Sequence, residues 1–228
     1  MCGIHASISV DGYQFPSNDI EALLCKRGPD HIGKWHIQTE DEDASHYLSF
    51  TSTVLALRGG HIASQPFVDS DTGSVLCWNG EIWKLGGEAI VSGNDGEILF
   101  DALVQAASRD IVGRPIGVLK VLSSISGPFA FVFLDKVHNQ LFFGRDRLGR
   151  RSLLYNARSN SIEFASISDP MKGDWKEVEA DATYMLTYSS EAHLGSDNSF
   201  VESLSPVFPT KRYPWENNVD ISVGNMIC

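Results

Sequence analysis

The sequence predicts an α+β fold in which antiparallel sheets carry helices on their outer faces. Strand-like segments dominate both ends of the chain, and two helix-like segments at about residues 94–108 and 116–125 separate them. Strands grouped before and after a helical block are typical of antiparallel sheets covered by helices. With 43% apolar residues in a chain of 228, the sequence can fill the core of one such domain.

The predicted strands are short runs that alternate between apolar and polar residues or are rich in β-branched and aromatic side chains. The first of them would anchor the N-terminus in a sheet and place Cys2 at the end of that sheet. The segments with these patterns are residues 4–10, 47–57, 74–78, 129–134, 140–144, 152–155, 161–164 and 183–188.

Two of the predicted helices carry capping signals. A helix over residues 18–26 would begin at Asn18, a preferred N-cap residue, and would end at the Gly-Pro pair that follows. The helix over residues 94–108 has Asn94 and Glu97 at capping-box spacing. The apolar residues expected on the buried faces of these helices are Ile20, Leu23, Leu24, Ile98, Leu99, Ala102, Leu103 and Ala106.

Two polar segments have no period and predict irregular structure. The acidic stretch 38–45 would be a solvated loop tip. From about residue 189 the chain is rich in Ser, Asn and Pro, and we expect residues 191–228 to be a linker or tail. The folded domain would then cover residues 2–190.

Composition limits the classes of partner and compartment. The net charge is −11 and no cluster of Lys and Arg occurs, which disfavours nucleic acid and anionic membranes as partners. No apolar run reaches the roughly 20 residues of a membrane span, and the N-terminus lacks a secretion signal, so we expect a cytoplasmic protein. Four cysteines occur without metal-ligand spacing, so no metal site is predicted. Cys25, in a helix, and Cys77, in a strand, are expected to be inert packing thiols.

Cys2 is the cysteine whose position indicates chemistry. If an aminopeptidase removes Met1, the chain begins with a thiol and a free α-amine on one Cα. The ordinary pKa of an α-amine is about 7.7–8.0 and that of a thiol about 8.5, so the amine can accept the thiol proton during nucleophilic attack. The alternative interpretation is an unremarkable cysteine in a frayed terminus.

Three further groups of residues have both a chemical and a structural interpretation. Asn79 and Gly80 follow a strand and can supply two N–H groups to an oxyanion, but Asn-Gly is also the commonest tight-turn dipeptide. Arg58 can hold a carboxylate in its guanidinium fork, or it can be a surface residue. Asp95 and Glu97 can hold an ammonium group, or they can stabilise the start of a helix.

Taken together, six motifs resemble one family, the class II glutamine amidotransferases, whose domain belongs to the N-terminal-nucleophile hydrolases. The Arg-Gly-Pro-Asp run is similar to that of the asparagine-synthetase branch. The motifs are Met1-Cys2-Gly3-Ile4, Arg27-Gly28-Pro29-Asp30, Asn79-Gly80-Glu81-Ile82, Asp95-Gly96-Glu97, Gly127-Pro128-Phe129-Ala130-Phe131 and Gly144-Arg145-Asp146-Arg147-Leu148-Gly149-Arg150-Arg151.

The resemblance implies a four-layer αββα sandwich of the N-terminal-nucleophile hydrolase type and a reaction on glutamine. The side-chain amide would be hydrolysed through a γ-glutamyl thioester on Cys2, which releases ammonia for asparagine biosynthesis. Asn79 and the backbone N–H of Gly80 would form the oxyanion hole.

The same resemblance implies a glutamine-binding set. Arg58 would bind the α-carboxylate, Asp95 the α-ammonium, and Glu81 would assist in the same pocket. Residues 27–30 and 145–149 would be scaffold around the site. A substrate other than glutamine is disfavoured, because Arg58 with Asp95 suits the two charges of a free amino acid.

The sequence departs from the family pattern in ways that leave alternatives open. The residues that follow Arg58 and Cys2 differ from the usual ones, and the Ser-Gly-Gly-x-Asp-Ser loop of an ATP-using synthetase domain is absent. This chain is therefore expected to need no cofactor itself, since ATP and Mg²⁺ would belong to the missing synthetase domain, in cis or in trans. The alternative to a glutaminase is a catalytically idle regulatory or binding module, and a homodimer is compatible with either.

Overall fold

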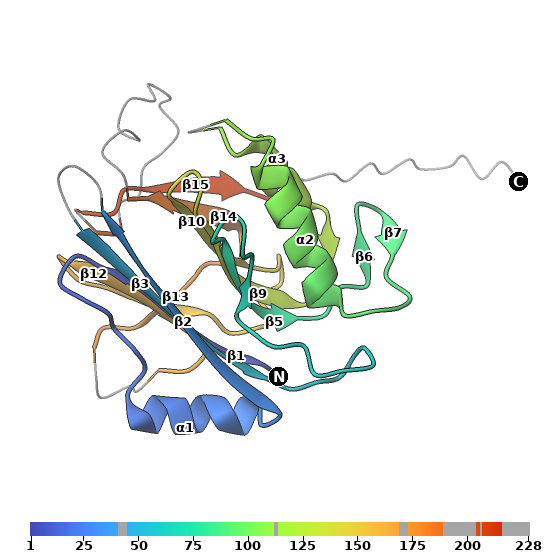
Figure 1. Cartoon of the computed structure of the whole chain (residues 1–228), viewed down its shortest axis with the longest axis horizontal. Coiled ribbons are helices and arrows are strands. Elements are labelled where there is room, and N and C mark those ends of the chain that lie inside the picture. The colour runs from blue at the N-terminus through green and yellow to red at the C-terminus, as the bar shows by residue number, and fades with distance from the viewer. Residues whose placement is uncertain (41–44, 112–113, 169–172, 189–203, 206, 216–228) are drawn as a thin grey trace, which may run out of the picture.

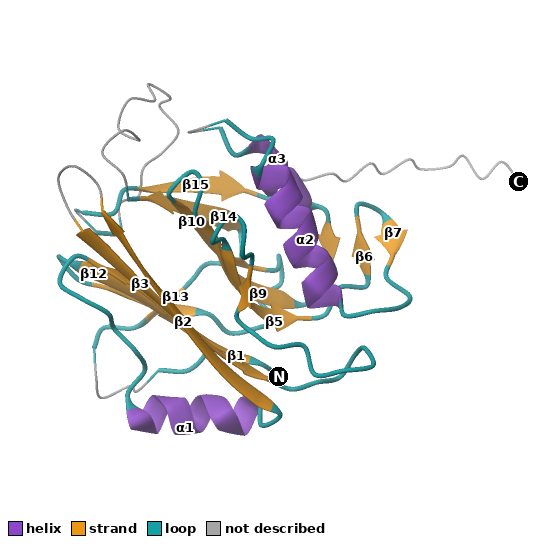
Figure 2. Ribbon diagram, viewed as in Figure 1, coloured by secondary structure: helices purple, strands orange, loops and turns teal. Residues whose placement is uncertain are grey.

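Two six-stranded antiparallel sheets lie face to face in this computed structural model (Figures 1 and 2). Helix α1 (Asn18–Arg27) covers the outer face of the first sheet, and helices α2 (Asp95–Ala107) and α3 (Ile116–Ser123) cover the outer face of the second. The layers are therefore helix, sheet, sheet and helix, which confirms the predicted four-layer αββα sandwich. The structure describes residues 1–40, 45–111, 114–168, 173–188, 204–205 and 207–215.

The first sheet holds the N-terminal strand in its interior. This strand, β1, pairs with β12 on one side and with β3 on the other. In spatial order the strands of this sheet are β13 (Lys176–Glu177), β11 (Leu154–Ala157), β12 (Ser161–Ala165), β1 (Gly3–Ser9), β3 (Ser45–Val54) and β2 (His31–Glu40).

The second sheet holds β5 next to β9, and a small third sheet extends from it beside α2. The strands of the second sheet in spatial order are β15 (Thr210–Pro214), β14 (Ala182–Thr187), β10 (Gln140–Arg145), β9 (Phe129–Asp135), β5 (Val75–Gly80) and β4 (Phe67–Val68). The third sheet contains β7 (Glu88–Ala89), β6 (Lys84–Leu85) and β8 (Ile125–Ser126).

The core consists of two layers that the strand alternation produces. On β1, Ile4, Ala6 and Ile8 point between the two sheets and are fully buried. Strand β9 is buried on both faces: alternate residues contribute to the layer between the sheets and to the layer under α2 and α3. Its residues are therefore continuously apolar until the final Asp135, as expected for a strand buried on both faces.

The start of α1 differs from the prediction. Ser17, and not Asn18, is the N-cap, and its hydroxyl accepts a hydrogen bond from the Ile20 N–H at 3.5 Å. Ile20 and Leu24 are buried as expected, but Leu23 is 38% exposed because the buried stripe of this helix is narrow. The predicted helix is confirmed and its first cap is shifted by one residue.

Helix α2 begins at the predicted N-cap residue, Asn94. Asn94 Oδ1 accepts hydrogen bonds from the N–H groups of Gly96 and Glu97 at 3.0 and 3.2 Å. The Glu97 carboxylate does not return a capping-box bond, since it lies 2.8 Å from His61 Nε2. Ile98 is 37% exposed, so the buried face is made chiefly by the residues after it.

The sequence pattern did not predict several short strands or the longer edge strand β2. Strand β2 runs as far as Glu40, so part of the predicted loop tip 38–45 is strand, and residues 41–44 lie outside the described part of the chain. β2 pairs with one neighbour only and carries His, Lys, Gln and Glu, which hide its period. None of the described helices is long and apolar enough to cross a bilayer.

The described part of the predicted tail is not a linker. Residues 210–214 form β15, which pairs with β14 along its whole length, and Phe208 is fully buried between the sheets. The Trp215 indole N–H donates to the Ala180 carbonyl at 3.1 Å. The sequence Thr-Lys-Arg-Tyr-Pro hides this strand, because two cations and a proline are typical of an edge strand and not of a core strand.

We expect Phe208→Ala to lower the free energy of unfolding by about 3–5 kcal/mol, because it would leave a cavity in the core. Urea unfolding followed by circular dichroism measures this change. The matched control is Val207→Ala, at a side chain that is 42% exposed, which should shift the free energy by no more than about 0.5 kcal/mol. Equal, small effects of both substitutions would contradict the packing described for this segment.

Candidate active site

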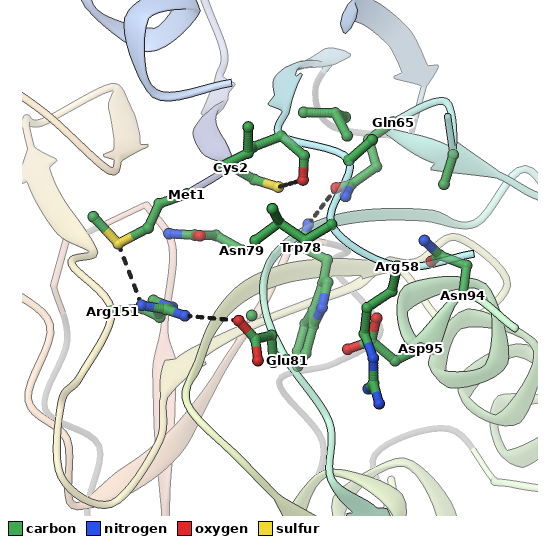
Figure 3. A pocket seen from close by; sticks show the side chains of 16 residues that line it. Met1, Cys2, Arg58, Gln65, Trp78, Asn79, Glu81, Asn94, Asp95 and Arg151 are labelled. Carbon is green, nitrogen blue, oxygen red and sulfur yellow. Dashed lines mark hydrogen bonds and ion pairs between the residues drawn. The ribbon is translucent and has the colours of Figure 1, made fainter. Parts of the chain in front are cut away.

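A cavity at the start of β1 gathers the predicted site residues (Figure 3). Its walls come from the residue before β1, the chain after β3, the end of β5 and the start of α2. These segments are far apart in sequence, and the two facing sheets bring them together. The predicted site residues that line the cavity are Cys2, Arg58, Asn79, Gly80, Glu81 and Asp95.

Cys2 is held by its backbone, while its thiol makes only a weak contact. Arg27 Nε donates to the Cys2 carbonyl at 3.2 Å, and the thiol lies 3.9 Å from the Leu55 carbonyl oxygen. Burial raises the pKa of the Cys2 thiol above its ordinary value, and the positive charges of the N-terminus and Arg27 oppose that rise only in part. The thiolate is therefore scarce at neutral pH, so attack by this sulfur needs a base.

Asn79 and Gly80 do not form the tight turn that their sequence permits. Both belong to β5 and pair with Ala130 and Phe129 of β9. The Asn79 side chain is buried, and its Nδ2 donor has no hydrogen-bond partner among the described residues. Buried side-chain donors are seldom unpaired. This one lies in the wall beside Cys2 (Figure 3).

Gly80 occupies a position where another residue would clash. A Cβ atom there would lie 2.7 Å from Phe129 Cβ and 2.8 Å from the Pro128 carbonyl oxygen. The next N–H, of Glu81, donates to the Pro128 carbonyl. Because N–H directions alternate along a strand, the Gly80 N–H points to the opposite edge of β5, on the same side as the Trp78 N–H.

Arg58 and Asp95 are both held by the backbone of Ile82. Arg58 Nη1 donates to the Ile82 carbonyl at 2.9 Å, and the Ile82 N–H donates to Asp95 Oδ2 at 2.6 Å. Arg58 Nη2 donates to the Ile90 carbonyl at 3.2 Å. A guanidinium has more donors than these two, so Arg58 can still bind a carboxylate.

Asp95 is a buried carboxyl at the first position of α2. Burial raises its pKa, while the hydrogen bond from Ile82 and the positive charge of Arg58 oppose the rise. The neighbouring charge of Glu81 raises it further. A cationic group entering the cavity would relieve this cost, because it would pair with the ionised carboxylate.

With Met1 in place the cavity is small. Its volume is about 60 Å³, well below the roughly 300 Å³ at which small-molecule sites begin. Met1 lines it: the Met1 ammonium donates to the Arg27 carbonyl at 3.2 Å, and Arg151 Nη1 lies 3.3 Å from the Met1 sulfur. Removal of Met1 would widen the cavity and expose the α-amine of Cys2.

Gln65 and Arg151 are polar lining residues that were not predicted as site residues. Gln65 accepts a hydrogen bond from the Trp78 N–H through its Oε1 at 2.9 Å, which fixes its place in the cavity wall. Arg151 Nη2 lies 3.7 Å from Glu81 Oε1, and its Nε is buried without a partner among the described residues. Both come from connecting segments. Arg151 belongs to the motif over residues 144–151, which could have indicated it, whereas Gln65 lies in none of the six motifs.

The segments expected to be scaffold hold the loops around the cavity. Arg145 donates to the carbonyls of Gly149, Arg151 and Val178, and so fixes the position of Arg151. The Asp146 carboxylate accepts hydrogen bonds from the N–H groups of Phe129 and Arg150, which holds the loop after β10 against β9. In the described residues no group of three or more His, Cys, Asp or Glu side chains is arranged to hold a metal ion.

Comparison with known proteins decides the family. The profile of a family described as "Glutamine amidotransferase domain" matches residues 1–221. The chain belongs to this family. It is the family that the sequence motifs resemble, the class II glutamine amidotransferases, and the described two-sheet sandwich is the fold of N-terminal-nucleophile amidotransferases.

Curated relatives are longer than this chain. Asparagine synthetase domain-containing protein 1 of Bos taurus is 30% identical over 224 residues, which cover 95% of this chain and 31% of that protein. The protein of the same name in Gallus gallus is 34% identical over 195 residues, which cover 82% of this chain and 29% of the relative. The chain thus spans about a third of the length of these relatives.

Solved structures support the fold. A glutamine phosphoribosylpyrophosphate amidotransferase from B. subtilis, complexed with ADP and GMP, superposes with a TM-score of 0.61. The match has 16% sequence identity and covers 95% of this amidotransferase chain and 50% of the other chain. At this identity the likeness shows the common fold alone.

The raised pKa of Cys2 predicts slow alkylation of the protein that retains Met1. At pH 8 iodoacetamide should modify Cys2 more slowly in the native chain than in the urea-unfolded chain, and the native rate should still rise above pH 9. Mass spectrometry of the Cys2 peptide against time measures both rates. Cys77, fully buried with a pKa raised by burial to about 12, should stay unmodified in the native chain. A native rate equal to the unfolded rate at pH 8 would contradict the described environment.

Proposed function

We propose that this chain is a glutaminase: it hydrolyses the side-chain amide of glutamine through a thioester on Cys2 and releases ammonia. The observation that carries the proposal is the unpartnered Nδ2 donor of buried Asn79 in the wall beside Cys2. An unpaired buried donor costs about 1–3 kcal/mol, and a negatively charged oxygen formed in the reaction would supply its partner.

Attack begins with the sulfur of Cys2 once Met1 has been removed. The α-amine of Cys2 takes the thiol proton, and Sγ forms a bond to the side-chain carbonyl carbon of glutamine. The carbonyl oxygen becomes an oxyanion that accepts hydrogen bonds from Asn79 Nδ2 and the Gly80 N–H. The base is needed because burial keeps the thiol protonated at neutral pH.

Collapse of this intermediate releases ammonia. The C–N bond breaks, the proton held by the α-amine passes to the leaving nitrogen, and a γ-glutamyl thioester remains on Cys2. Water then attacks the thioester with the amine again acting as base, which gives glutamate and the free thiol. No metal or cofactor takes part in these steps as proposed.

Recognition of glutamine would rest on the two charged groups at its α-carbon. Arg58 would bind the α-carboxylate with the donors that Ile82 and Ile90 leave free, and Asp95 would bind the α-ammonium. The side chains of Arg58 and Asp95 are both hydrogen-bonded to the backbone of Ile82, so the distance between them is fixed before the substrate binds. Glu81 would add negative charge on the ammonium side, with Arg151 setting its position.

The proposed acceptor of ammonia lies outside this chain. The relatives are named for an asparagine synthetase domain and are about three times as long as the matched region. We therefore propose that the ammonia serves a synthetase-type module in asparagine biosynthesis in the cytoplasm. The alternative, an idle module with the same fold, is favoured by one observation, namely that Met1 blocks the α-amine of Cys2 and lines the cavity.

We expect Cys2→Ala to abolish glutamate release from glutamine by the protein that lacks Met1, because it removes the nucleophile. Coupled glutamate dehydrogenase assays measure the release, and intact mass shows the state of the N-terminus. Cys25→Ala, which changes a half-buried cysteine on α1, is the matched control and should keep full activity. Undiminished release by Cys2→Ala would rule out the mechanism.

We expect Asn79→Ala to lower kcat by about 10²–10³-fold with little change in KM, since the lost donor acts on the oxyanion and not on bound glutamine. Steady-state kinetics over a range of glutamine concentrations separates the two constants. An increase in KM at unchanged kcat would place Asn79 in substrate binding and refute the oxyanion role. Arg58→Lys is the contrasting variant and should act mainly on KM.

A further inference from the structure

A second cavity lies on the outer face of the first sheet and shares no lining residue with the Cys2 cavity. Its volume is about 430 Å³, within the roughly 300–1,000 Å³ typical of small-molecule sites. His5 of β1 and Glu163 of β12 form its floor. One wall is the connection from β1 to α1, which Figure 1 shows in dark blue beside β12, and Arg158 and Trp175 contribute the other.

The floor of this cavity contains a buried acceptor without a donor. His5 is 2% exposed, and its Nε2 lies 3.5 Å from Glu163 Oε2. With a proton on Nε2 facing the carboxylate, Nδ1 is left as an acceptor, and it has no partner among the described residues. Nδ1 is closed off from solvent, so a molecule in the cavity meets the Glu163 carboxylate and not this nitrogen.

The cavity presents one negative and one positive charge side by side. Glu163 Oε1 lies 3.2 Å from Arg158 Nη2, and the Arg158 side chain is 52% exposed, so Arg158 is accessible to a ligand. Burial alone would raise the pKa of Glu163, but the hydrogen bond from His5 and the charge of Arg158 hold it below its ordinary value. A singly charged ligand would be attracted by one of these groups and repelled by the other. A zwitterion matches both.

The rim of the cavity is aromatic and is held in place. Tyr13 and Phe15 are 38% and 42% exposed, with ring centroids 6.2 Å apart. The segment between them is anchored to the sheet, because the Gln14 carbonyl accepts a hydrogen bond from the Ser7 hydroxyl at 2.9 Å. Exposed rings fixed at a cavity mouth can receive an apolar or aromatic side chain.

We propose that this cavity binds a free α-amino acid with an apolar or aromatic side chain. The ammonium lies on Glu163, the carboxylate lies on Arg158, and the side chain lies against the aromatic rim. This site is separate from the proposed glutamine site and does not depend on its chemistry. Because His5 belongs to β1, the ligand contacts the strand that holds Cys2 in place.

Isothermal titration of the full chain with L-phenylalanine tests the proposal. We expect a Kd below about 1 mM, and at least about tenfold weaker binding of N-acetyl-L-phenylalanine and of L-phenylalaninamide, each of which lacks one charge. Arg158→Gln should weaken L-phenylalanine about tenfold and leave L-phenylalaninamide unchanged, since the amide has no carboxylate. Arg109→Gln, at an exposed arginine after α2, is the matched control and should bind as the native chain does.

Two outcomes would overturn the proposal. One is the absence of binding by L-phenylalanine, L-leucine and L-tryptophan at millimolar concentration, which would mean that the Glu163 and Arg158 charges pair with each other and not with an amino acid. The other is binding that Arg158→Gln does not change, which would place the amino acid in the Cys2 cavity. Phe15→Ala, at the exposed rim, provides a second variant that should weaken L-phenylalanine while the circular dichroism spectrum stays native.

Discussion

The site depends on the packing that brings the start of β1 against the end of β5. β1 is paired on both sides, with β12 and with β3, so two ladders fix its place in the first sheet. Its inner residues pack with those of β5 in the layer between the sheets. Because β1 begins at Gly3 and β5 ends at Gly80, Cys2 emerges beside Asn79 without any flexible connection.

This packing lets the folded protein keep buried polar groups at the site, although their burial lowers its stability. The Asn79 amide has an unpaired buried donor, the Cys2 thiol and the Asp95 carboxyl are both desolvated, and each of these raises the free energy of the folded state. The apolar layers on either side of β9 offset that cost. Such groups concentrated at one cavity are typical of a functional site, where a substrate supplies the missing partners.

Much of the fold could be predicted because its central strands are long, apolar and buried. β9, β10 and β14 were found from composition and alternation alone, and so were α2 and its Asn94 cap. The edge strands β2 and β15 were missed, since their exposed polar side chains resemble loop sequence and their pairing is set by neighbours far along the chain. Local pattern could not show that Asn79 and Gly80 are strand residues, because only the pairing with β9 excludes a turn.

The family of the chain follows from the profile match over residues 1–221, while the roles given to single residues are our proposals. The most direct test of the central claim is to treat the Met1-processed protein with the electrophilic glutamine analogue 6-diazo-5-oxo-L-norleucine and map the product by mass spectrometry. We predict a single adduct on Cys2, formed more slowly when glutamine competes and lost when Asp95 is replaced by Ala. No adduct on Cys2, or an adduct whose formation glutamine does not slow, would contradict the claim that this cavity recognises glutamine.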